Sequence, residues 1–203
     1  MKQQRLPFLL KDLSIDLCKY MLLVSPDQRI INRIDGVKKT AYRICKGKGV
    51  YTLAHITIAS FYAGKHLEPL LLQVLQEICD RQLQFRIRFQ GIDGFVSNDN
   101  CTIYIRIEEH QPFLKFANDL RLLSATLKSS GYRVANRVNN PHCTIVRGLP
   151  RATYTDAMHF YKDNVFYDTC LAKNLVLMKR EIVDSHSQLI TTFQLPSPHY
   201  LLN

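Results

Sequence analysis

The sequence predicts an α+β protein: a single bilobal domain over residues 1–203, with two pseudo-twofold duplicated lobes of antiparallel strands and flanking helices around a central cleft. Three observations predict this fold class. Strand-like and helix-like segments alternate, two strand-like segments flank a turn-rich stretch typical of a hairpin, and one short motif occurs in both halves. The hairpin argues against a doubly wound parallel sheet, whose strands are joined through helices.

The first half of the chain alternates strand and helix. Residues 20–24 form an apolar run that a Ser-Pro pair ends, and apolar residues within 30–41 then recur at helical spacing. A Gly/Lys-rich turn at 46–49 leads to an apolar strand at 53–60, and Pro69 begins a helix with an apolar stripe. This half is therefore predicted as strand, helix, strand, helix.

The second half repeats this plan after a hairpin. Apolar residues alternate with polar ones at 85–89 and 103–107, which predicts an antiparallel pair. Pro112 begins one long helix, which Gly131 ends before a strand at 140–147. The remaining predicted elements are a short helix and two strands, at 156–162, 175–178 and 189–195.

The composition is that of an ordinary soluble protein, with 46% hydrophobic and 22% charged residues. The longest apolar runs are too short to cross a bilayer, and the first 11 residues lack the apolar region of a signal peptide. We therefore expect a cytoplasmic protein without membrane contact. The six cysteines have no metal-ligand spacing and most stand among apolar residues, which predicts reduced thiols in the core.

The chain is strongly basic. Its formal net charge is +10, and the first 50 residues hold 11 basic and 4 acidic side chains. This excess favours an anionic partner such as nucleic acid, although a basic balance can also serve solubility alone. Charge by itself leaves both explanations open.

One motif occurs twice, as His55-Ile56-Thr57-Ile58 and His142-Cys143-Thr144-Ile145, and the residues on either side of the two copies also match. Side chains on a strand alternate between faces, so the imidazole and the hydroxyl of each copy project from the same face. The repetition indicates an internal duplication, in which the two motif strands would face each other across the cleft.

Two imidazoles can divide the work of cleaving a phosphodiester, since one removes a proton from the nucleophile while the other protonates the leaving oxygen. The two Thr hydroxyls would donate to the non-bridging phosphate oxygens. A single copy would be explained as a strand Thr beside a partly buried His, but two matched copies favour chemistry. A metal site is the rival use of His; the motif supplies no second ligand, so we predict no metal and no cofactor.

The two H-x-T-aliphatic motifs resemble those of the two-histidine (2H) phosphoesterases, which include 2′-5′ RNA ligase-like proteins and cyclic nucleotide phosphodiesterases. The resemblance covers nearly the whole chain, because the opening strand, the Pro before His142 and the last strands fit the family's layout. It implies that His55 and His142 are the catalytic acid and base. It also implies that Thr57 and Thr144 bind the phosphate, in a cleft between two pseudo-symmetric lobes.

Arg147 is a further candidate for phosphate or substrate binding, because relatives of the RNA ligase-like branch often carry Arg at this place. Its equivalent in the first copy is Ser60. Strict alternation would put Arg147 on the face away from His142, so this role requires the strand to end or twist before Gly148. A solvated surface Arg is the alternative.

Four other residues are secondary candidates. Lys46 and Lys48 could steer a polyanion towards the cleft, or simply stand in a flexible surface loop. Phe61 or Phe95 could stack on a base, with core packing favoured for Phe61 and the role of Phe95 open.

The leading functional hypothesis is a metal-independent phosphodiesterase that acts on a 2′,3′-cyclic phosphate or a 2′-5′ linkage of RNA or an oligonucleotide, with ligation as the reverse reaction. Its partner would be RNA or a nucleotide, and a monomer is the default oligomeric state. Two alternatives stay open: a hydrolase of a small cyclic nucleotide or cyclic oligonucleotide signal, and an RNA-binding module without turnover. The sequence does not say which His is the base, because the two exchange roles when the reaction reverses.

Overall fold

The computed structural model describes residues 16–98, 100–132, 134–162, 165–182 and 186–198. Nine strands form one sheet in the order β7-β3-β4-β6-β2-β1-β8-β9, with β5 paired to β2 beside this path. All the pairings are antiparallel. The strands are β1 (Leu17–Val24), β2 (Ile56–Gly64), β3 (Phe85–Phe95), β4 (Cys101–Ile107), β5 (Val134–Arg137), β6 (His142–Leu149), β7 (Tyr167–Ala172), β8 (Asn174–Glu181) and β9 (Gln188–Gln194).

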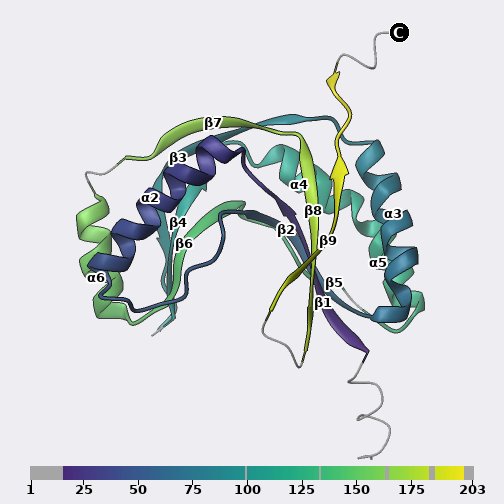
Figure 1. Cartoon of the computed structure of the whole chain (residues 1–203), viewed down its shortest axis with the longest axis horizontal. Coiled ribbons are helices and arrows are strands. Elements are labelled where there is room, and N and C mark those ends of the chain that lie inside the picture. The colour runs from purple at the N-terminus through teal and green to yellow at the C-terminus, as the bar shows by residue number, and fades with distance from the viewer. Residues whose placement is uncertain (1–15, 99, 133, 163–164, 183–185, 199–203) are drawn as a thin grey trace, which may run out of the picture.

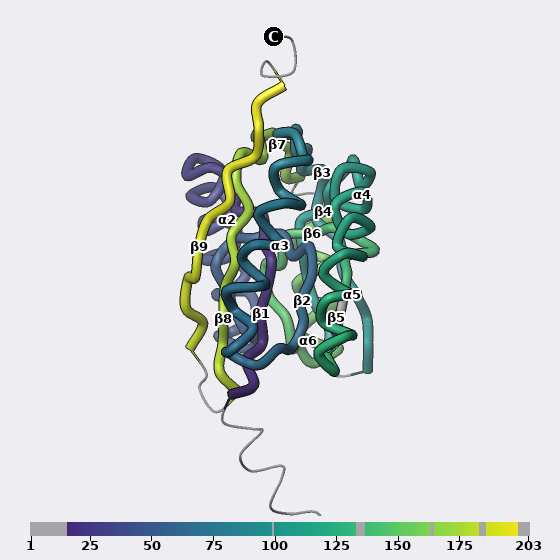
Figure 2. The backbone as a smooth tube through the Cα atoms, turned by 90° about the vertical axis from the view of Figure 1, so that its right-hand side faces the viewer, coloured from purple at the N-terminus to yellow at the C-terminus, as the bar shows by residue number. Residues whose placement is uncertain are grey.

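The helices lie at the two outer sides of an arched sheet (Figure 1). Helices α2 and α6 pack beside β3, β4, β6 and β7, and α3, α4 and α5 pack on the half that contains β1, β2 and β5. Figure 2 shows α3 and α5 in front of the strands of that second half. The helices are α2 (Gln28–Ile44), the short 3₁₀ helix η1 (Lys65–Leu67), α3 (Glu68–Asp80), α4 (Gln111–Asp119), α5 (Arg121–Ser129) and α6 (Arg151–Tyr161).

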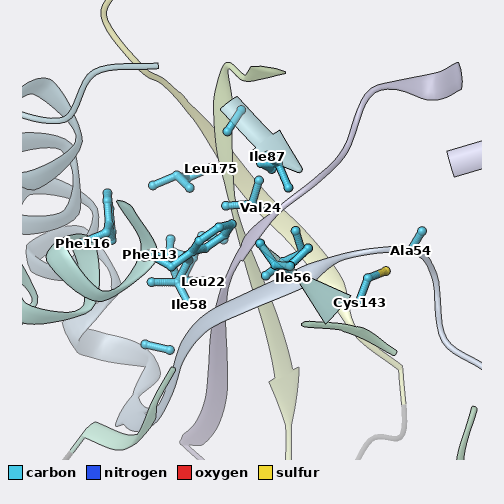
Figure 3. Close-up of a cluster of buried hydrophobic side chains, with 14 of the residues drawn as sticks. Leu22, Val24, Ala54, Ile56, Ile58, Ile87, Phe113, Phe116, Cys143 and Leu175 are labelled. Carbon is cyan, nitrogen blue, oxygen red and sulfur yellow. The ribbon is translucent and has the colours of Figure 1, made fainter. Parts of the chain in front are cut away.

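The core lies between the sheet and these helices. Tyr20, Ile56 and Phe61 are fully buried there, and the rings of Tyr20 and Phe61 stack with centroids 5.5 Å apart. The core therefore takes the side chains on one of the two faces of β1 and β2. Ile56 and Cys143, which separate His from Thr in the two motifs, both belong to this core (Figure 3). The expected core position of Phe61 is confirmed.

Helix α2 is fixed at its beginning by two sets of contacts. The side chain of Asp27 caps the helix by accepting a hydrogen bond from the backbone N–H of Ile30, at 2.9 Å. The guanidinium of Arg29 donates two hydrogen bonds of 2.8 Å to the carboxylate of Asp168 on β7, and Arg33 donates to the same carboxylate. These contacts hold α2 against the sheet.

The predicted α+β class is confirmed, with differences in one long helix, one short helix and two strands. The single helix predicted from Pro112 to Gly131 is wrong, because the chain forms α4 and α5 with Leu120 between them at ψ 3°. Asn118 and Asp119, which are weak helix formers, stand just before this break. Helix α6 begins directly after Pro150, five residues earlier than predicted. Strands β5 and β7 were not predicted; exposed side chains interrupt the apolar pattern of β7.

The two motif strands are neighbours in the sheet, whereas we expected them to face each other across a cleft. Strands β2 and β6 share one residue pair, Ile56 opposite Cys143, and from Ala59 onward β2 pairs with β5 instead. The two halves of the sheet therefore meet at this pair.

The cysteine prediction agrees with the structure, because all six cysteines are buried free thiols. Among the described residues, no helix combines the length and apolar character that a membrane span needs.

Candidate functional site

The two His/Thr pairs meet at the centre of the sheet. Ile56 and Cys143 are opposite each other in antiparallel register, and both point into the core. Extending this register by one residue in each direction places His55 beside Thr144 and Thr57 beside His142, on the other face of the sheet. All four side chains are half-buried. We call the face that carries these four residues the site face.

Both imidazoles are held in the same way by their own backbone. The Nδ1–H of His55 donates to the carbonyl of Leu53 at 2.8 Å, and the Nδ1–H of His142 donates to the carbonyl of Asn140 at 2.8 Å. A carbonyl can only accept, so these bonds place the proton of each neutral ring on Nδ1. The lone pair of each Nε2 is then the one available to a substrate.

The surroundings of the two rings keep them neutral. Burial lowers the pKa of His55, and the nearby charges of Lys38, Arg147 and His142 lower it further, against the opposing effect of the hydrogen bond to Leu53. Burial also lowers the pKa of His142, opposed by its hydrogen bond to Asn140. Each imidazole is therefore suited to accept a proton at neutral pH, and the cationic surroundings favour an anionic ligand.

A β-bulge in β6 brings Arg147 onto the site face. Thr144 pairs with Tyr104 and Val146 pairs with Ile103, so Ile145 has no partner on β4. Because of this bulge, the consecutive residues Ile145 and Val146 both point into the core. The next residue, Arg147, therefore lies on the same face as His142 and Thr144. The bulge supplies the change of face that a role for Arg147 at the site requires.

Strand β2 contains a matching bulge at the equivalent position. Leu23 pairs with Thr57 and Leu22 pairs with Ala59, so Ile58 has no partner on β1. Ser60, the counterpart of Arg147, thereby joins the site face. The signal was present in the sequence, since in both copies the Thr is followed by two apolar residues and then a polar one.

The loop before His55 is fixed by two contacts that the sequence did not indicate. The backbone of Val50 exchanges hydrogen bonds of 2.7 Å and 3.2 Å with that of Arg147. The buried ammonium of Lys38 on α2 donates to the carbonyl of Thr52. Lys38 lies one turn after Ile34 on the buried stripe of α2, and a lysine at such a position was the available signal.

An aromatic cluster surrounds His142. Its ring lies 4.9 Å from that of Tyr104 and 5.1 Å from that of Phe95, and the Phe95 and Tyr104 rings stack at 4.4 Å. Phe95 keeps 38% of its surface exposed. This exposed fraction keeps Phe95 a candidate for stacking on a base of the substrate.

Lys46 and Lys48 are exposed in the turn that precedes Val50. In the part of the chain that the structure describes, no group of three or more His, Cys, Asp or Glu side chains is placed to hold a metal ion.

The sequence profile of the 2′-5′ RNA ligase superfamily matches residues 26–184, which include both motifs. The chain belongs to this superfamily. No curated protein sequence matches this superfamily member significantly.

Solved structures share the fold of this superfamily member at low sequence identity. The crystal structure of TT0787 of Thermus thermophilus has a TM-score of 0.67 and 17% identity, covering 89% of this chain and 100% of that one. The crystal structure of E. coli LigT complexed with 3′-AMP has a TM-score of 0.64 and 14% identity, covering 89% of this chain and 99% of LigT. LigT has also been crystallised with ATP, in a structure with a TM-score of 0.62 and 15% identity that covers 89% of this chain and 99% of LigT.

Proposed function

We propose that this protein is a metal-independent phosphodiesterase that acts on a 2′,3′-cyclic phosphate or a 2′-5′ linkage of RNA or an oligonucleotide. One observation carries the proposal: two histidines from the two halves of the chain share one face of the sheet, and each is anchored through Nδ1 so that Nε2 is available. Membership of the 2′-5′ RNA ligase superfamily supports it. The solved complexes of LigT with 3′-AMP and ATP support a nucleotide ligand.

In the proposed hydrolysis, a water oxygen attacks phosphorus while its proton passes to Nε2 of one histidine. The protonated Nε2 of the other histidine gives its proton to the ribose oxygen as the bond from that oxygen to phosphorus breaks. The two rings end with exchanged protonation states, and proton exchange with solvent restores them. In ligation a ribose hydroxyl of a second strand takes the place of water: its proton passes to one histidine, and the other histidine protonates the ribose oxygen that leaves the cyclic phosphate. Cleavage of the new linkage by that neighbouring ribose hydroxyl is the reverse reaction, in which the two histidines exchange roles.

The remaining site residues would bind the phosphate. The hydroxyls of Thr57 and Thr144 lie beside the opposite motif's histidine and would donate to the non-bridging oxygens. The guanidinium of Arg147 would add a charge-assisted hydrogen bond. Because both histidines have lowered pKa values, the negative charge of the bound phosphate would help to protonate the one that acts as acid.

The proposal is tested with purified protein in EDTA and a panel of 2′,3′-cyclic phosphate, 2′-5′-linked and 3′-5′-linked oligonucleotides. We expect turnover that EDTA does not reduce, and a loss of at least about 100-fold in kcat/KM in both His55→Ala and His142→Ala, the contribution of one acid or base. His159→Ala, on the exposed surface of α6, is the matched control.

Two other results of this experiment would each indicate a different function. Turnover of small cyclic nucleotides in preference to every oligonucleotide would indicate a hydrolase of a signalling nucleotide. Salt-sensitive binding of RNA without turnover, weakened only modestly in the histidine variants, would indicate a binding module.

A further inference from the structure

Two like charges stand directly opposite each other on neighbouring strands of the site face. Lys19 of β1 pairs with Arg180 of β8, and both side chains are half-buried. Like charges in directly opposed positions destabilise a sheet. The stability of the sheet therefore does not explain why these two cations lie opposite each other.

No carboxylate compensates these charges among the described residues. Lys19, Arg180 and Arg147 form no ion pair there. Glu181, next to Arg180, pairs with Lys65 at 3.6 Å. Three cationic side chains are thus left available to an external anion.

The strand register places Lys19 on the site face. Along β1, Leu23 is opposite Thr57, Met21 is opposite Ser60 and Lys19 is opposite Tyr62. Directly opposed residues of an antiparallel pair share a face, so Lys19 and Arg180 lie on the same face as the His/Thr pairs. The four residue-to-residue steps from Leu23 to Lys19 span about 13 Å, which long basic side chains can partly bridge.

Arg147 connects this pair to His55. Burial lowers the pKa of Lys19, and the nearby charges of Arg180 and Arg147 lower it further. Arg147 also acts on the pKa of His55, after burial and Lys38. The bulge of β6 puts Arg147 on the same face of the sheet as Lys19 and Arg180, so the three cations form one basic strip that extends from the His/Thr pairs along β1 and β8.

We propose that Lys19 and Arg180 form a second phosphate site, which binds the phosphate that neighbours the reacting one in the substrate. This inference deepens the proposed function and rests on it. The preferred substrate then carries two phosphates, as an oligonucleotide or a 5′-phosphorylated nucleotide does, and a nucleoside with one cyclic phosphate is a poorer substrate.

The test compares three substrates: adenosine 2′,3′-cyclic phosphate, its 5′-phosphorylated form, and the dinucleotide ApA ending in the same cyclic phosphate. We expect kcat/KM to be higher for the substrates with two phosphates, and Lys19→Gln or Arg180→Gln to lower their advantage by about tenfold, the effect of one hydrogen bond between charged groups. If only the dinucleotide has the higher kcat/KM, the site binds an internucleotide phosphate. If both substrates with two phosphates have it, the site binds either an internucleotide phosphate or a terminal 5′-phosphate.

The matched control removes the same kind of charge from the other face. Lys115→Gln on α4 and Lys128→Gln on α5 replace exposed lysines on helices that cover the core face. Neither change should alter the preference for two phosphates. An advantage that persists undiminished in the Lys19 and Arg180 variants would overturn the inference, even while hydrolysis of the single-phosphate substrate upholds the proposed function.

A binding measurement decides the matter without turnover. In the His55→Ala background, the affinity for ApA with its cyclic phosphate should fall with salt, and Lys19→Gln should reduce the slope by about 0.7, the value for one phosphate contact of a single strand. An unchanged slope contradicts the second phosphate site. Thermal unfolding checks the fold, because relief of a like-charge pair predicts a Tm no lower than that of the wild type; a marked fall in Tm would show that the pair is structural.

Discussion

Lys38 is the residue whose role departs most from what its sequence position suggests. A lysine on a helix normally extends to solvent, but Lys38 is only 7% exposed and its ammonium donates to the carbonyl of Thr52 behind the site. Burial lowers the pKa of Lys38 itself. As a cation it also opposes protonation of His55, so it helps to set the pH at which His55 can act.

Replacing Lys38 with Met should raise the pKa of His55, because a positive charge that disfavours the imidazolium is removed while the volume is kept. The measurement is an NMR titration of the His55 ring, with the pH profile of kcat/KM as the functional readout. One limb of that profile should move to higher pH. Lys39→Met, on the exposed side of the same helix, is the control. An unmoved titration would show that Lys38 acts only through its hydrogen bond.

Four site residues could be predicted from sequence because their chemistry is local: a His and a Thr two positions apart on a strand share a face whatever surrounds them. Arg147 could not be placed by the same argument. Its orientation depends on the unpaired Ile145. Two apolar residues after the Thr are compatible with a bulge, but strict alternation is the default for a strand, and only the pairing with the partner strand decides between the two. Lys38 was missed because its partner is a backbone carbonyl, that of Thr52, and a backbone acceptor leaves no mark in the residue pattern.

At the scale of elements, the turn that leads into the first motif is shaped by close packing. Gly49 has φ +89°, and a Cβ there would lie 2.5 Å from Cγ2 of Val146 and 2.9 Å from Cδ2 of Leu149. Only glycine satisfies both the backbone conformation and the approach to β6. The chain just after Gly49 pairs with Arg147, so this turn positions both the loop before His55 and the bulged strand.

Gly49→Ala should lower the free energy of unfolding by about 1–3 kcal/mol, through overpacking against β6 and through the positive φ. Gly36→Ala is the matched control, since its Cβ would meet nothing within 4 Å in the interior of α2. That change should instead raise stability by about 0.5–1 kcal/mol. Urea unfolding of the two variants measures both effects, and equal stabilities would contradict the packing argument.

Element prediction succeeded where apolar periodicity was strong and failed where tertiary contacts decide. The apolar stripe of Pro112 to Gly131 continues through Leu120, so periodicity alone could not detect the break between α4 and α5. Strand β5 is four residues long and pairs only with the far part of β2. Such a short strand forms because the edge of a partner strand is available to it. The local residue pattern contains no information about that partner.

For the whole molecule, the site carries a cost in stability that depends on pH. The pKa values of His55 and His142 are lowered in the folded protein from the ordinary value of 6.5. Below that value the unfolded chain binds more protons than the folded one, so stability is full above about pH 6.5 and declines as the pH falls. Two histidines kept neutral by burial therefore weaken the fold in acid.

The Tm should fall between about pH 7.5 and pH 5, and the fall should be smaller in the double variant His55→Gln/His142→Gln, which removes the two groups responsible. His159→Gln gives the control for loss of an exposed histidine. Thermal unfolding at the two pH values measures this, and an equal fall in the double variant would assign the acid sensitivity to other groups.

The single contact between the motif strands makes the chemistry depend on how the two halves of the molecule are joined. Each half supplies one histidine and one threonine, and Ile56 opposite Cys143 is the one residue pair through which β2 and β6 meet. Neither half holds both histidines by itself. A change in packing beneath this pair would alter the spacing of the two imidazoles while leaving each His/Thr pair intact, so the proposed activity depends on hydrophobic residues on the opposite face of the sheet from the two imidazoles.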